Sequence, residues 1–170
     1  MKKNQRFKKW NVVLALLLAL TLTFNMTAPV QAAPTPYGVA AKVKSAVGKS
    51  NYPFNYQNNV TSKRKVFGVK VSDMSKYVAY EKVTGSGKNQ VEYILFIGQA
   101  KSKAKAKSAR NTLKTYISNE AKSMNSYLSS TGKKVFKNAQ IGYSGKWVWV
   151  VMMKSSSVNK KAVKAIKKAI

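Results

Sequence analysis

A group of cations with no acidic neighbours is the feature of this sequence most able to perform binding chemistry. If the segment from Lys101 onwards is helical, four cations recur at steps of four, three and four and form one stripe: Lys103, Lys107, Arg110 and Lys114. No acid stands four residues from any of them. Free N–H groups at a helix start also attract anions. We therefore predict an anion-binding site on this stripe. The alternative is a solvated helix start that only keeps the protein soluble.

The C-terminal segment carries a second group of cations. Val158, Ala162 and Ile166 recur at helical spacing and predict an apolar stripe. A secondary basic face lies mostly opposite that stripe and consists of Lys160, Lys161, Lys164 and Lys168. A basic amphipathic helix can lie on an anionic membrane, but we expect the apolar stripe to pack on its own domain.

Trp147 and Trp149 alternate along a predicted strand, where they could stack on sugars or bases. We expect them in the core instead, because both faces of that strand are apolar.

The side chains that serve catalysis are scarce. The chain has 32 Lys and Arg against four acids, no His and no Cys, and a formal net charge of +28. Glu81 and Glu92 lie across a predicted hairpin, and a carboxylate pair can hydrolyse glycosides, but among so many lysines we expect both in salt bridges. We predict no catalytic residue, no metal site and no cofactor. The charge favours a polyanion as partner.

Residues 1–32 have the order of a secretory signal peptide. Five cations precede an apolar run over residues 12–20, and small residues precede Ala33, so we predict cleavage after Ala32. The alternative is an uncleaved membrane anchor, but a spanning helix needs about 20 apolar residues. Cleavage leaves 27 basic and four acidic residues, hence a formal charge of +23.

Residues 33–170 have the length of one domain with one core. The predicted elements alternate between helices and hairpins: a leader over 33–36, a helix over 37–47, a hairpin over 77–98, a long helix from 102–108 to a Gly132 C-cap, a hairpin over 135–153 and a helix over 158–170. This order predicts an α+β fold, with two hairpins forming a mainly antiparallel sheet. The long central helix and the two terminal helices would cover one face of that sheet.

The hydrophobic pattern predicts a single core between sheet and long helix. Its expected members are Ile94, Phe96, Leu113, Ile117, Trp149 and Val151.

Residues 77–170 resemble an uncharacterised family of small exported proteins, often lipoproteins, from Gram-positive bacteria. The resemblance rests on "VAYEKV", "VEYILFIGQAKS", an amphipathic helix and the strand–Gly–strand "NAQIGYSGKWVWVVM". This chain departs from the family in two respects: it lacks the lipidated Cys, and its helices carry almost only Lys where the family mixes Lys with acids. The resemblance implies export and the fold, but no activity.

Three functions are compatible with these features. The first is a secreted or loosely wall-associated, non-enzymatic envelope protein that binds anionic polymers or surfaces, such as wall teichoic acid or lipid headgroups. The second is a secreted nucleic-acid-binding protein that uses the same cations. The third is a membrane-active basic bacteriocin or toxin.

Overall fold

A four-stranded antiparallel sheet organises residues 32–170, the part of the chain that the computed structural model describes. The predicted signal peptide lies almost entirely outside these residues. In spatial order the strands are β3 (Met74–Thr84), β4 (Val91–Ala100), β6 (Trp147–Met152) and β5 (Gln140–Ser144). The β3–β4 and β5–β6 hairpins were both predicted, and β4 pairs with β6 to join them.

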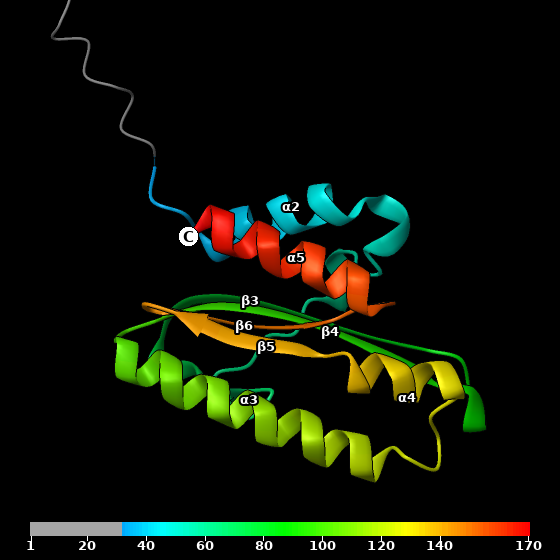
Figure 1. Ribbon diagram of the computed structural model, residues 1–170. Coiled ribbons are helices and arrows are strands. Elements are labelled where there is room, and N and C mark those ends of the chain that lie inside the picture. Colours follow the sequence, from blue (N-terminus) through cyan, green and yellow to red (C-terminus); the bar gives the residue numbers. More distant parts are fainter. Residues whose placement is uncertain (1–31) are drawn as a thin grey trace, which may run out of the picture. The chain divides into compact units, whose positions relative to one another are not determined.

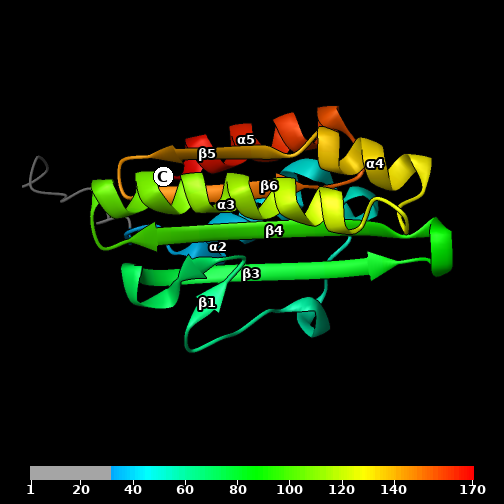
Figure 2. The ribbon, with the colours of Figure 1, turned by 90° about the horizontal axis from the view of Figure 1, so that it is seen from below.

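Four helices cover this sheet on both faces (Figure 1). On one face lie α2 (Pro36–Val47) and α5 (Ser156–Ala169), and on the other lie α3 (Lys103–Ser123) and α4 (Ser130–Lys137). The α+β class is confirmed, but the expectation that helices cover one face is wrong. Both faces need cover because the central strands β4 and β6 are apolar on both sides. Figure 2 shows α3 running along the sheet.

The sheet divides the interior into two cores, so the prediction of a single core is wrong. Ile94 and Phe96 pack with Leu113 and Ile117 on the α3 face. Trp149 and Val151 belong to the core on the α2 and α5 face, with Leu95 and Ile97. The period of two along each strand sends neighbouring residues to opposite cores.

The region between α3 and β5 differs most from the prediction. The long helix ends at Ser123, and residues 130–137, the last three of which were expected as a strand, form α4. The Ser129 hydroxyl accepts a hydrogen bond from the Gly132 N–H at 3.0 Å and caps α4. Gly132 is therefore not a C-cap. A Cβ there would lie 2.5 Å from the Gln90 carbonyl oxygen, so glycine permits the close approach of this helix to the start of β4.

The remaining elements are short. The predicted leader is one residue too long, because Pro36 is the first residue of α2 and Thr35 caps it. The connection from α2 to β3 contains a two-stranded ribbon of β1 (Lys65–Val66) and β2 (Val69–Lys70). Four short 3-10 helices complete the described elements: η1 (Lys49–Asn51), η2 (Tyr56–Asn58), η3 (Val71–Asp73) and η4 (Gly87–Asn89).

Candidate anion-binding site

Helix α3 positions the predicted stripe. It starts where the Ser102 hydroxyl accepts a hydrogen bond from the Lys105 N–H at 3.2 Å, within the range expected for its start. Its inner side consists of small and aliphatic residues that are buried against the sheet: Ala106, Ala109, Leu113 and Ile117. These contacts leave the cations on the outer side and the flanks of the helix.

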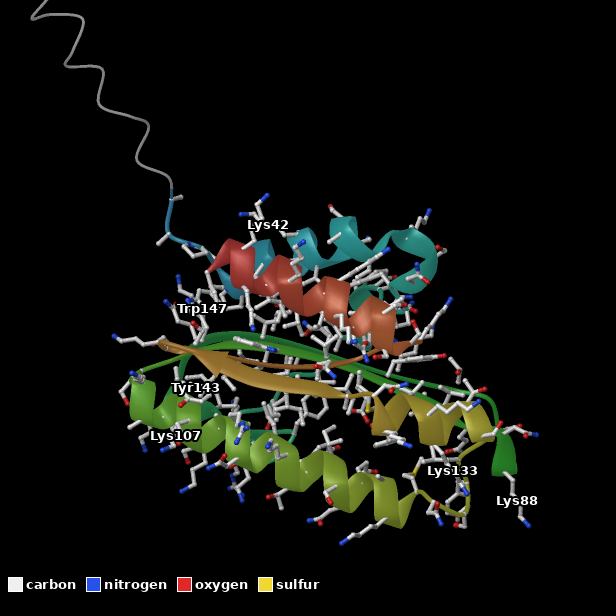
Figure 3. The ribbon with its side chains drawn as sticks, in the orientation of Figure 1. Lys42, Lys88, Lys107, Lys133, Tyr143 and Trp147 are labelled. Atoms are coloured by element: carbon white, nitrogen blue, oxygen red, sulfur yellow. The ribbon has the colours of Figure 1, made fainter. Side chains whose placement is uncertain are left out.

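The structure brings the four predicted residues together on one flank of α3. Lys103, Lys107 and Lys114 are exposed, and Arg110 is half-buried. The Arg110 guanidinium donates a hydrogen bond from Nη1 to Asn111 Oδ1 at 3.1 Å, whereas its Nε is buried without a partner. Lys114 also lines a groove with Ile141 of β5, which shows that this flank faces the β5 edge of the sheet. Figure 3 shows Lys107 near the start of α3 and Lys133 on α4.

None of the four stripe cations is neutralised by an acid of the described domain. Across residues 32–170, the one ion pair joins Lys105 Nζ to Asp73 Oδ1 at 2.9 Å. Lys105 projects from the other flank of α3, towards the residues that precede β3. The stripe therefore keeps its full charge.

The three glutamates lie near one another on that same other flank. Glu92 of β4 is only 2 % exposed, and its carboxyl group is hydrogen-bonded to Glu81 of β3. Burial is the main cause that raises the pKa of Glu92 to about 8, and the charges of Glu81 and Glu120 contribute to the same rise. Burial is also the main cause that raises the pKa of Glu81, and the charge of Glu120 raises it as well. A hydrogen bond with Glu92 acts in the opposite direction and lowers the pKa of Glu81.

The expectation that Glu81 and Glu92 form salt bridges is therefore wrong for the described residues. The pKa of each carboxyl group is raised instead, and Glu92 Oε1 has no hydrogen-bond partner among the described residues. A buried carboxyl group without a cation remains neutral because ionisation in an apolar site is costly. In residues 32–170, no group of three or more His, Cys, Asp or Glu side chains is arranged to hold a metal ion.

The stripe and the glutamates thus lie on different flanks of α3. Its β3 flank carries Glu120, and Thr112 and Tyr116 on this flank contact Gly68 and Phe67 of the β1–β2 ribbon. Its β5 flank carries the stripe. Spacing along α3 explains this, because residues 112, 116 and 120 lie on one side and residues 103, 107, 110 and 114 on another.

A groove continues the stripe between α3, α4 and β5. Its volume is about 550 Å³. The cations at this groove are Lys114 of α3 with Lys133 and Lys137 of α4. Its apolar lining includes Ile117, Ala121, Leu128, Phe136 and Ile141. Lys133 and Lys137 were not among the site residues predicted from the sequence. Their spacing of four around the apolar pair Val135–Phe136 was a signal of a short amphipathic helix.

The secondary basic face lies on the opposite side of the sheet from the stripe (Figure 1). Lys160, Lys161, Lys164 and Lys168 are exposed on α5. Val158, Ala162 and Ile166 are buried, which confirms that the apolar stripe of α5 packs on its own domain. Asn159 anchors this helix, because its Oδ1 accepts a hydrogen bond from Met153 N and its Nδ2 donates one to Asn138 O, both at 2.9 Å.

The two tryptophans of the domain are core residues, as expected. Trp147 is 8 % exposed and Trp149 is 3 % exposed. The Trp149 ring covers Gly142 of β5, where a Cβ would lie 2.5 Å from the indole. Neither ring is available to stack on a base or a sugar.

Comparisons with protein-family models, with curated proteins and with solved structures found no match to this chain. Within the described helices, none is both long and apolar enough to cross a membrane.

Proposed function

We propose that the chain is an exported, non-enzymatic protein of a Gram-positive cell envelope that binds anionic polymers through the stripe on α3. The observation that carries this proposal is the separation of the stripe from the acids near that helix. Lys103, Lys107, Arg110 and Lys114 lie together without an acidic partner among the described residues, while the three glutamates lie on the other flank. A cluster of like charges costs free energy in the isolated protein, and this cost is recovered when phosphates neutralise it.

The composition of the stripe favours a flexible polymer over a specific nucleic-acid sequence. Three of its four cations are Lys, a hydrated point charge that lacks the bidentate fork of Arg. The buried tryptophans remove a stacking surface for bases. The buried apolar stripe of α5 likewise counts against a membrane-active toxin that inserts this helix.

Replacement of the four stripe residues with Gln tests the proposal. If each cation contacts one phosphate, the quadruple variant should flatten the log–log salt dependence of binding to duplex DNA by about 3–4, and by less on a flexible single chain. The matched control is the quadruple Gln variant of Lys160, Lys161, Lys164 and Lys168 on α5. Affinity is measured against teichoic-acid-bearing cell walls, DNA and anionic liposomes.

The outcomes separate a site from unspecific attraction. A larger loss for the α3 variant supports a site on the stripe, and the strongest of the three binding partners identifies the polymer class. Equal losses for both variants would mean that binding follows total charge. If neither variant changes affinity for any of the three, the proposed polyanion binding is wrong.

A further inference from the structure

The groove between α3, α4 and β5 combines two properties that suit one class of ligand. Six of its eleven lining residues are apolar, and Ile117, Leu128 and Phe136 are the most buried of them. Its volume of about 550 Å³ lies within the range of about 300–1,000 Å³ for small-ligand sites. Three lysines from two helices also line it. An apolar chain fits the first property, and an anionic headgroup fits the second.

We propose that this groove binds single-chain anionic amphiphiles, with the alkyl chain on the apolar lining and the phosphate or carboxylate headgroup among the three lysines. The proposal rests on the proposed function in one respect, since Lys114 belongs to both the groove and the stripe. The groove would recognise the alkyl chain of the ligand, whereas a stripe of cations recognises only its negative charge.

The arrangement of the lysines supports this assignment. Lys133 and Lys137 are one turn apart on α4 and both are exposed, while Phe136 between them is 6 % exposed and turned inward. Lys114 reaches the groove from α3. Among the described residues none of the three is in an ion pair, so an incoming anion does not have to displace an acid.

Hydrogen bonds of the α3–α4 connection hold the apolar lining of the groove in position. Leu128 is held by a backbone hydrogen bond from its N–H to Met124 O at 3.0 Å, and the next residue, Ser129, donates from N and Oγ to Gln90 O at 3.1 and 3.2 Å. These bonds fix the α3–α4 connection to the start of β4. The apolar lining is therefore in place before a ligand arrives, which lowers the entropic cost of binding.

The test uses the full domain and dodecyl phosphate below its micelle concentration. Ala121 is half-buried and lines the groove, so Ala121→Trp should fill it and weaken dodecyl phosphate binding on the order of tenfold, because the alkyl chain loses its apolar contacts. The matched control is Ala104→Trp, an exposed position on α3 that does not line the groove. Both variants should keep the wild-type affinity for polyphosphate.

A second variant tests the headgroup without risk to the fold. Lys133→Gln with Lys137→Gln should weaken dodecyl phosphate binding roughly three- to tenfold, since exposed ion pairs contribute modestly. The control is Lys160→Gln with Lys161→Gln on α5. Dodecyl maltoside, which has the same chain and a neutral headgroup, should bind wild type and both Gln variants equally weakly.

Three results would overturn the proposal. These are a wild-type protein that does not bind monomeric dodecyl phosphate, an Ala121→Trp variant that binds it normally, or binding only to vesicles of anionic lipid. The last would assign a membrane surface instead. If neither the wild type nor any variant bound polyphosphate, the proposed function would be wrong. The dodecyl phosphate measurements would still show whether the groove binds an amphiphile.

Discussion

Glu92 is an acidic residue in the interior of a domain whose formal charge is strongly positive. It is 2 % exposed, its carboxyl group is hydrogen-bonded to Glu81, and its Oε1 has no partner among the described residues. No lysine of the described residues forms an ion pair with it, although lysine is abundant in this chain. Burial raises the pKa of this carboxyl group, so its protonation contributes to the stability of the fold.

Stability should therefore fall as pH rises through the neutral range. In the unfolded chain Glu92 loses its proton near its ordinary pKa of 4.5, whereas in the folded protein it keeps the proton to a pKa of about 8. Between these values the folded state binds more protons, so the free energy of unfolding decreases with pH, by at most about 1.4 kcal/mol per unit for one proton. Above a pH of about 8 this loss is complete.

Glu92→Gln measures this effect. The amide can still donate a hydrogen bond to Glu81 but does not ionise, so the variant should lose less stability than wild type between pH 5 and pH 8, and should be the more stable of the two at pH 8. Urea unfolding at pH 5, 6, 7 and 8 provides the comparison. Parallel pH profiles for the two proteins would show that Glu92 is ionised in the folded state.

At the scale of elements, the sheet acts as a partition between two cores. Leu113 of α3 and Ile166 of α5 are both fully buried, but they belong to different hydrophobic clusters on opposite faces of the sheet. Each helix is thus held by its own set of contacts with β4 and β6. This separation predicts that a destabilising substitution in one core does not change the effect of a substitution in the other core on the free energy of unfolding.

Leu113→Ala and Ile166→Ala should each lower the free energy of unfolding by about 2–5 kcal/mol. The double variant should lose the sum of the two to within about 0.5 kcal/mol, because the sites share no contacts. Denaturant unfolding of the four proteins of this cycle gives the values. A coupling energy clearly above that limit would mean that the two cores behave as one. If Leu113→Ala lowered the free energy of unfolding by less than about 0.5 kcal/mol, α3 would not pack there.

At the scale of the whole molecule, the formal charge is strongly positive, and this fits the export that we propose. Residues 33–170 carry a formal charge of +23, and the described acids lie inside or beside the β3 flank of α3. We expect a domain with this surface to attract polyanions at low salt. Secretion would place it among the anionic polymers of the cell envelope.

We expect the exported protein to begin at Ala33, since Val30 and Ala32 have the small side chains that signal cleavage requires. N-terminal sequencing of the protein from culture medium or a wall fraction checks this. An intact Met1 in a membrane fraction would contradict cleavage and favour an anchor.

The sequence by itself determined the class of the fold and the stripe. Periodicity identified both hairpins, the start of α3 and the amphipathic pattern of α5, because these patterns depend on local spacing. The four stripe cations share a flank for the same local reason. Even the burial of Trp147 and Trp149 followed from a strand that is apolar on both sides.

Only the tertiary structure decided where these parts meet. Apolar residues on both faces of β4 require two cores, but their spacing does not say which helix covers which face. The start of α4 depends on contacts of Ser129 and Gly132 with Gln90, about forty residues earlier, which local pattern cannot encode. The groove and the carboxyl pair likewise join distant segments, and the raised pKa of Glu92 exists because packing removes it from water.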